Sequence, residues 1–220
     1  MTETPERIVI ATQNPHKVEE LGAIFGDAAP GVSIVGLAEV GGPFDEPVED
    51  GDTFVANATI KARAYAAATG LWCLADDSGL EVDALGGKPG VISSHYFCDG
   101  GASDLPRVER DRLNNERVLR ELDGIDDSER AARFVCVMVL ADAHGVVHAS
   151  VRGSFDGRIG VPPRVPAGEH GFGYDPIFVT AESGFMRTGA EVPPAEKNQI
   201  SHRAAAGRAM ATELRNLMGG

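Results

Sequence analysis

The chain has 220 residues, enough for one sizeable hydrophobic core, and its composition of 43% hydrophobic and 24% charged residues is ordinary for a globular protein. Its formal net charge of -13 argues against a nucleic-acid polymer or an anionic membrane as the main partner. A small anion stays compatible with this charge, provided that local cations, backbone amides or a metal ion hold it.

The three cysteines, Cys73, Cys98 and Cys136, are odd in number, and no CxxC pair or His/Cys spacing indicates a zinc site. Cys73 and Cys136 lie in apolar, strand-like runs, which predicts buried thiols. The first residues form no apolar signal-peptide region, and no apolar run reaches about 18 residues. We therefore expect a cytoplasmic enzyme or binding protein.

Strands and helices alternate in the first half of the chain, and a hairpin follows in the second half. The Gly/Pro-rich stretches 41–51 and 160–171 are predicted loops. Apolar periodicity predicts strands at 8–11, 32–35, 71–75, 133–140 and 146–152, the last continuing into 154–159, and helices at 15–25, 53–69, 104–122 and from 202 onward. This order predicts an α/β fold with a mixed sheet.

Capping residues mark the ends of two of these helices. Asn14 is a suitable N-cap, with Pro15 at the first helical position. Asp52 or Thr53 is expected to cap the Ala-rich second helix, with Gly70 in the position after its end. The core contacts expected for the helix at 104–122 are Leu105, Val108, Leu119 and Leu122.

A pair of aspartates follows the apolar run 71–75, and we expect the strand to end abruptly there, at Asp76-Asp77-Ser78-Gly79. Mg²⁺ prefers carboxylate and phosphate oxygens, so this pattern indicates magnesium-dependent phosphate chemistry. Adjacent strand residues point to opposite faces, and Asp77 is the better candidate for the site. Asp76 would orient the turn or reach the metal through water. The alternative is an Asx-type turn with exposed carboxylates.

The segment Thr12-Gln13-Asn14-Pro15-His16-Lys17 forms a second candidate site, at a strand-to-helix turn. A helix N-terminus presents free amides and a partial positive charge, which favour a phosphate. Lys17 in the first turn opposes the usual preference for acidic residues, and a bound polyanion would explain it. The alternative is an ordinary capped helix with a solvated lysine. The turn lacks the glycines of a Walker loop or a dinucleotide fingerprint.

Glycines flank an aromatic residue in Gly171-Phe172-Gly173-Tyr174-Asp175-Pro176-Ile177-Phe178. Such an aromatic can lie on a surface where a flat ligand stacks, or it can be a core residue at the start of a strand.

Cations gather in Glu196-Lys197-Asn198-Gln199-Ile200-Ser201-His202-Arg203, which we expect to place Lys, His and Arg at another helix N-terminus. A bound anion would again explain cations in this position. The alternative is an exposed, capped helix.

Six motifs in this order resemble the inosine triphosphate pyrophosphatase family of noncanonical purine nucleoside triphosphate pyrophosphatases, over nearly the whole chain. They are IVIATQNPHKVEEL, TFVANATIKA, ADDSGLEVDALGGKPGV, ARFVCVMVL, GFGYDPIF and EKNQISHR. The resemblance implies one elongated domain over residues 1–220, with a central mixed β-sheet flanked by helices in the inosine triphosphatase-like (anticodon-binding/Maf-like) architecture. It also implies Mg²⁺-dependent hydrolysis of ITP, dITP and XTP to the monophosphate and pyrophosphate, by a homodimer that cleanses the nucleotide pool.

The resemblance assigns roles to individual residues. Asp77 would be the proton acceptor and a magnesium ligand, with Glu49 as the best match for a second acidic ligand and Glu46 as its competitor. The residues that would bind the substrate are Thr12, Gln13, Asn14, Pro15, His16 and Lys17 at the triphosphate, Ser78, then Phe172, Gly173, Tyr174 and Asp175 at the base, and Lys197, His202 and Arg203.

Three residues depart from the family pattern: Gln13 replaces a small residue, His95 replaces an arginine and Ala204 replaces a glycine. Gln13 could narrow the phosphate turn. If the arginine of the family contacts a phosphate or the dimer partner, His95 would make that contact shorter and pH-dependent. Two alternative functions are a Maf-type nucleotide pyrophosphatase and a nucleotide-binding protein that has lost catalysis.

Overall fold

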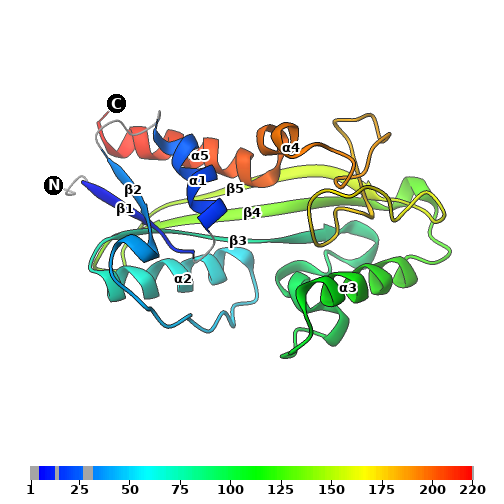
Figure 1. The fold of residues 1–220 in the computed structure, drawn as a ribbon, viewed down its shortest axis with the longest axis horizontal. Coiled ribbons are helices and arrows are strands. Elements are labelled where there is room, and N and C mark those ends of the chain that lie inside the picture. The colour runs from blue at the N-terminus through cyan, green and yellow to red at the C-terminus, as the bar shows by residue number, and fades with distance from the viewer. Residues whose placement is uncertain (1–4, 13–14, 27–31, 220) are drawn as a thin grey trace. The chain divides into compact units, whose positions relative to one another are not determined.

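The computed structural model describes residues 5–12, 15–26 and 32–219. These residues form a mixed α/β fold with one sheet and flanking helices (Figure 1). In chain order the strands and α-helices are β1 (Arg7–Ile10), α1 (Pro15–Gly26), β2 (Ser33–Gly36), α2 (Phe54–Thr69), β3 (Trp72–Val82), α3 (Arg107–Glu121), β4 (Ala131–Ala141), β5 (Val147–Ile159), β6 (Phe178–Thr180), α4 (Pro194–Ile200) and α5 (His202–Leu217). A 3₁₀ segment, η3 (Gly90–Cys98), precedes α3.

The sheet has the strand order β2-β1-β3-β4-β5-β6. Strand β1 runs parallel to both of its neighbours, with Val9 opposite Val35 in β2 and Cys73 in β3. Strand β6 is antiparallel to β5. The sheet is therefore mixed, which confirms the α/β fold with a mixed sheet that the sequence predicts.

The chain divides into two compact units. The first contains the described residues up to Asp77, then 136–153 and those from 203 onward; the second contains 78–135 and 154–202. Strands β3, β4 and β5 each contribute residues to both units. The assignment of residues 1–220 to a single domain stays a prediction.

Helices cover both faces of the sheet in the first unit, with α1 and α5 on one side and α2 on the other (Figure 1). The core under α1 and α5 joins Leu21 and Phe25 of α1 to Met210 and Leu214 of α5. Gly207 of α5 permits this close approach, because a Cβ there would lie 3.0 Å from a methyl carbon of Ile24.

The ends of α2 match the sequence prediction. Thr53 is the N-cap, and its Oγ1 accepts a hydrogen bond of 3.2 Å from the amide of Ala56. Gly70 follows the helix with φ of 68°, a left-handed conformation that glycine adopts without steric cost.

Strand β3 corrects one prediction: it does not end at Asp76 but continues through Asp77 and Ser78 to Val82. The reason is that the apolar alternation resumes at Leu80 and Val82, both fully buried, so the backbone stays extended across the polar residues. The alternative of an Asx-type turn at the aspartates is therefore wrong.

Helix α3 corrects part of a second prediction: Leu119 and Leu122 pack in the core as expected, but Leu105 and Val108 do not. Leu105 lies before the helix and Val108 is 83% exposed, so neither is a core residue. The core face carries Asn114 and Val118, and Leu122 just past the helix end is fully buried.

The two thiols predicted to be buried are buried, since Cys73 and Cys136 have no exposed surface. Burial raises the pKa of Cys73 to about 11. None of the helices within the described residues combines the length and the apolar character that a membrane-spanning segment needs.

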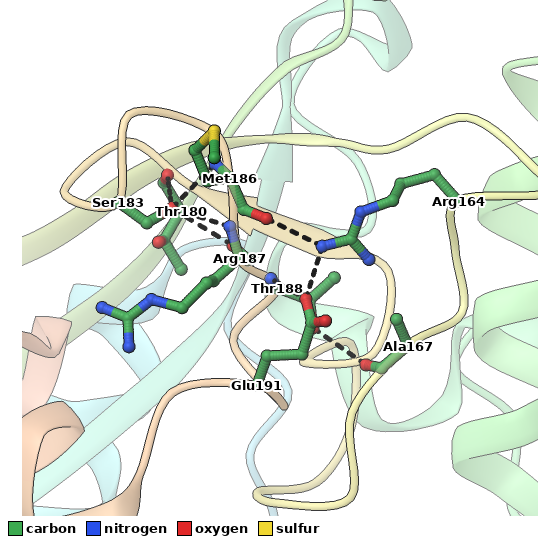
Figure 2. A network of polar contacts seen from close by, with 8 residues as sticks. All are labelled: Arg164, Ala167, Thr180, Ser183, Met186, Arg187, Thr188 and Glu191. Carbon is green, nitrogen blue, oxygen red and sulfur yellow. Dashed lines mark hydrogen bonds and ion pairs between the residues drawn. The ribbon is translucent and has the colours of Figure 1, made fainter.

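Loops on either side of β6 are tied together by a polar network in the second unit (Figure 2). Ser183 Oγ accepts from the amides of Met186 and Arg187, at 3.1 and 3.0 Å. Glu191 Oε2 accepts from the amide of Thr188 at 2.7 Å and from the guanidinium of Arg164 at 2.6 Å. These bonds fix the backbone at 188–191, which borders the Gly171–Phe178 motif.

Candidate active site

Two aspartates of β3 lie among cationic groups in the first unit. Asp76 is buried, and its Oδ2 lies 4.0 Å from Nε of Arg203, while Asp77 is half-buried. The ammonium of Lys61 donates to the backbone carbonyl of Asp76 at 3.0 Å. Lys61 and Arg203 therefore offset part of the cost of burying these carboxylates inside a strand.

Lys61 is a member of this site that sequence reasoning did not single out. Its Nζ lies 2.8 Å from Oε2 of Glu49. Burial alone would lower the pKa of Lys61, but the carboxylates of Glu49, Asp76 and Asp77 outweigh burial and raise it. A signal for Lys61 exists in the sequence, because a lysine on the buried, Ala-rich face of α2 is costly without acidic partners.

Of the two candidate acidic ligands, Glu49 and Glu46, it is Glu49 that pairs with Lys61. Lys61 is coupled to Glu49 together with Asp76 and Asp77. Glu46 instead acts on Tyr65, whose pKa is raised by burial and then by that carboxylate. Among the described residues, no group of three or more His, Cys, Asp or Glu side chains comes together as a metal site. The choice of Glu49 as a metal ligand stays a prediction.

The phosphate turn predicted at 12–17 falls only partly within the described structure. Thr12 is half-buried directly after β1, and its amide bonds to the carbonyl of Ile10 at 2.8 Å. Gln13 and Asn14 lie outside the described residues. Pro15, as predicted, begins α1, and His16 and Lys17 continue its first turn.

An exposed aromatic stands in the second unit, at the GFGYDPIF motif. Phe172 is 55% exposed, which contradicts its alternative as a core residue. The guanidinium of Arg107 lies over its ring, 4.3 Å from the centroid, and Nζ of Lys197 is 5.9 Å from the same point. Its amide donates to Oδ2 of Asp175 at 2.8 Å. The ring can therefore present an aromatic surface to a flat ligand.

Asp175 and Tyr174 are buried beneath this aromatic. Asp175 is 2% exposed, and its Oδ2 also accepts from Nζ of Lys197 at 2.5 Å. Glycines make room for it: a Cβ at Gly171, where φ is 73°, would collide with Oδ2, and one at Gly189 would lie 2.7 Å from Oδ1. Tyr174 donates through its hydroxyl to a backbone carbonyl at 2.7 Å. Asp175 and Tyr174 thus anchor the backbone that carries the exposed Phe172.

The prediction that Lys197 lies at a helix N-terminus is wrong. Lys197 occupies the last turn of α4, a separate helix with a proline in its first turn. Ser201 adopts an extended conformation, with φ of -66° and ψ of 160°, and separates α4 from α5. His202, the first residue of α5, stacks on Phe134 with ring centroids 5.2 Å apart.

The predicted substrate-binding residues of the EKNQISHR motif are divided between the two units. Lys197 and His202 belong to the second unit, with Ser78, whereas Arg203 belongs to the first.

A family model settles the relationship that the motifs suggest. It describes the Ham1 family and matches residues 8–213, which is most of the chain. The chain belongs to the Ham1 family.

Named relatives and solved structures agree with this assignment. The chain is 46% identical to a dITP/XTP pyrophosphatase of Nocardia farcinica, over 94% of this chain and 92% of the relative. It is 44% identical to one of Frankia alni, over 96% and 98%. Among solved structures, a HAM1 protein from Coxiella burnetii superposes with a TM-score of 0.79 at 39% identity, covering 96% of this chain and 98% of that one. The dITP/XTP pyrophosphatase from Mycobacterium abscessus gives 0.71 at 42% identity, covering 93% and 97%.

In this Ham1 protein, two of the three departures from the family pattern lie in described residues. His95 contacts Nη1 of Arg110 through Nε2 at 2.6 Å and Oγ of Ser94 through Nδ1 at 2.9 Å. Burial, and then the Arg110 cation, lower the pKa of His95, which favours the neutral imidazole. Ala204 is 1% exposed within α5. Gln13 lies outside the described residues.

Proposed function

We propose that this Ham1 protein hydrolyses noncanonical purine nucleoside triphosphates, dITP, XTP and ITP, to the monophosphate and pyrophosphate. The names of its relatives support dITP and XTP as substrates. The observation that carries the proposal is the cluster around Lys61, whose ammonium pairs with the carboxylate of Glu49 and lies within electrostatic reach of the carboxylates of Asp76 and Asp77. Such a cluster combines a cation for phosphate oxygens with carboxylates for a metal and a proton.

Magnesium fits the carboxylates of Asp77 and Glu49. Mg²⁺ is usually held by one or two carboxylates together with substrate phosphates and water, so this pair would suffice. Asp77 and Glu49 would hold the ion, and it would supply positive charge that offsets part of the negative charge of the phosphates.

Asp77 is the residue that we assign to proton transfer. A water attacking the α-phosphorus would lose its proton to this carboxylate while the bond to the departing pyrophosphate breaks. General-base help of this kind contributes roughly 10²–10⁴ in rate. Lys61 would neutralise charge on the phosphates, and the turn at 12–17 would hold them through helix amides.

The base is assigned to the second unit, where Phe172 would stack on the purine. Lys197 and His202 would complete the nucleotide contacts there, and Ser78 would touch the substrate. Arg203, in the first unit, stays a predicted substrate contact. Selection would depend on the 6-position, because a keto oxygen accepts from a hydrogen-bond donor such as a backbone amide. The 6-amino group of adenine leaves such donors unpaired, which is penalised strongly.

A substrate panel tests the proposal. Pyrophosphate release is measured with Mg²⁺ and each of ITP, XTP, dITP, GTP, ATP and dTTP. We expect the first three to be turned over fastest. Turnover of ATP equal to or faster than that of ITP, or none with ITP, would overturn the proposal. Binding of ITP without turnover would favour the alternative of a nucleotide-binding protein.

The family resemblance also supports a homodimer, and the nucleotide substrates support a cytoplasmic location. Light scattering checks the first, since a dimer has twice the chain mass of 23.1 kDa. A mass of one chain at micromolar concentration would contradict it.

A further inference from the structure

We infer that one face of α3, formed by Arg107, Asp111 and Asn115, positions the turn at Phe172 and thereby sets the affinity for the purine base. These residues are spaced by four and so lie on the same side of the helix. The inference rests on the proposed function, because it assumes that the base stacks on Phe172. The three side chains act as positioning residues rather than catalytic ones.

The helix holds both polar groups of one residue in that turn. The amide of Gly173 donates to Oδ2 of Asp111 at 3.0 Å, and its carbonyl accepts from Nδ2 of Asn115 at 3.0 Å. Gly173 has φ of 63°, a conformation that other residues rarely adopt. A turn of this shape needs anchors, and α3 supplies two of them at the residue next to Phe172.

Arg107 links the same anchor to the aromatic ring. Its guanidinium lies 4.3 Å from the centroid of Phe172, and its Nε lies 3.7 Å from Oδ2 of Asp111. One carboxylate oxygen therefore serves both the backbone amide and the arginine that covers the ring. Phe172 as a whole still keeps 55% of its surface exposed.

The turn is held from a second direction as well. Phe172 donates its amide to the buried carboxylate of Asp175 at 2.8 Å. Anchors on two consecutive residues, from α3 and from Asp175, leave the backbone little freedom. Without the hydrogen bonds from α3, the Phe172 ring would be more mobile. Binding of the base would then have to order the ring, which lowers the affinity.

The test separates binding of the base from binding of the phosphates. KM and kcat for ITP, and the inhibition constant of inorganic tripolyphosphate, are compared for the unaltered protein and for Asp111→Ala. We expect Asp111→Ala to raise the KM for ITP about five- to tenfold, with kcat and the tripolyphosphate constant within about twofold. Asp111→Asn keeps an acceptor for the Gly173 amide and should restore more than half of the lost affinity.

Controls make the outcomes distinct. Glu116→Ala removes a carboxylate from the exposed side of α3, where it pairs only with Arg112 among the contacts described, and should change neither constant. The side chain of Arg107 is mostly exposed, so Arg107→Ala should leave folding intact. We expect it to raise the KM for ITP about twofold to threefold. An unchanged KM in Asp111→Ala, or equal losses for ITP and tripolyphosphate, would overturn the inference. No pyrophosphate from ITP with the unaltered protein would overturn the proposed function instead.

Discussion

Replacing Asp175 by asparagine distinguishes a supporting carboxylate from one that only contacts substrate. The carboxylate is 2% exposed and accepts from both the amide of Phe172 and the ammonium of Lys197. Asparagine has nearly the same size, so Gly171 and Gly189 still leave room for it. Its charge is gone, however, and its amide nitrogen cannot accept from Lys197.

The magnitude follows from the environment of the pair. Removing one partner of a fully buried ion pair costs about 3–5 kcal/mol. The Lys197 side chain keeps 16% of its surface exposed and can recover part of its hydration. We therefore expect a loss of about 2–3 kcal/mol in the free energy of unfolding. For a chain of this size, that loss lowers the melting temperature by roughly 5–10 °C.

Thermal unfolding of the substrate-free protein is the assay, followed by circular dichroism or calorimetry. Asp156→Asn is the matched control, because Asp156 is 66% exposed and lies 3.9 Å from its arginine partner. Such a surface pair contributes at most about 1 kcal/mol. A melting temperature for Asp175→Asn equal to that of the control would refute the supporting role and leave Asp175 as a substrate contact only.

Three further predictions concern catalysis and pH. Asp77→Asn should abolish turnover while ITP binding by calorimetry persists, and Asp83→Asn, an exposed control, should leave turnover unchanged. Lys61→Met should lower kcat/KM for ITP by about 10²–10³ without preventing folding; a smaller change than tenfold would remove it from phosphate binding. Arg164 lowers the pKa of Glu191 from its ordinary value of 4.5, so the stability that this carboxylate contributes is present above that pH and is lost as the pH falls through the lowered pKa. Accordingly, the melting temperatures of Glu191→Gln and the unaltered protein should differ at neutral pH and converge in strongly acidic buffer, and a difference that persists there would contradict the ion pair.

Local sequence signals predicted most of the fold. Thr53 and Gly70 mark the ends of α2 because caps and left-handed glycines act within a few residues of the helix. The second half of β3 was missed because Asp76, Asp77 and Ser78 interrupt an apolar run. The groups that make those charges tolerable, Lys61 and Arg203, come from other elements of the fold, so the residues around the aspartates do not reveal the pairing.

In the candidate site too, local signals were readable from the sequence, whereas contacts made by the fold were not. Glycines on both sides of Phe172 left an exposed aromatic and a core aromatic both open, and the structure shows that the residue is exposed. The burial of Asp175 depends on Gly189 and Lys197, which only the fold brings to it. The sequence does contain a signal for α4 as a separate helix, because a proline in its first turn is typical of a helix start.

An acidic chain can bind a polyanion only if some cations are held where the polyanion would lie, and three cations of the predicted site lie beside carboxylates. Lys61 pairs with Glu49, Lys197 with Asp175, and Arg203 lies near Asp76. Lys61 and Lys197 are thus each held by a carboxylate, so little of their side-chain entropy would remain to be lost on contact with a phosphate oxygen. The same carboxylates offset the charge of these cations in the free protein, so a chain with a net charge of -13 can still hold cations at the predicted site. Electrostatic preference for the triphosphate then depends on the few ion pairs that the ligand can replace, rather than on the charge of the whole chain.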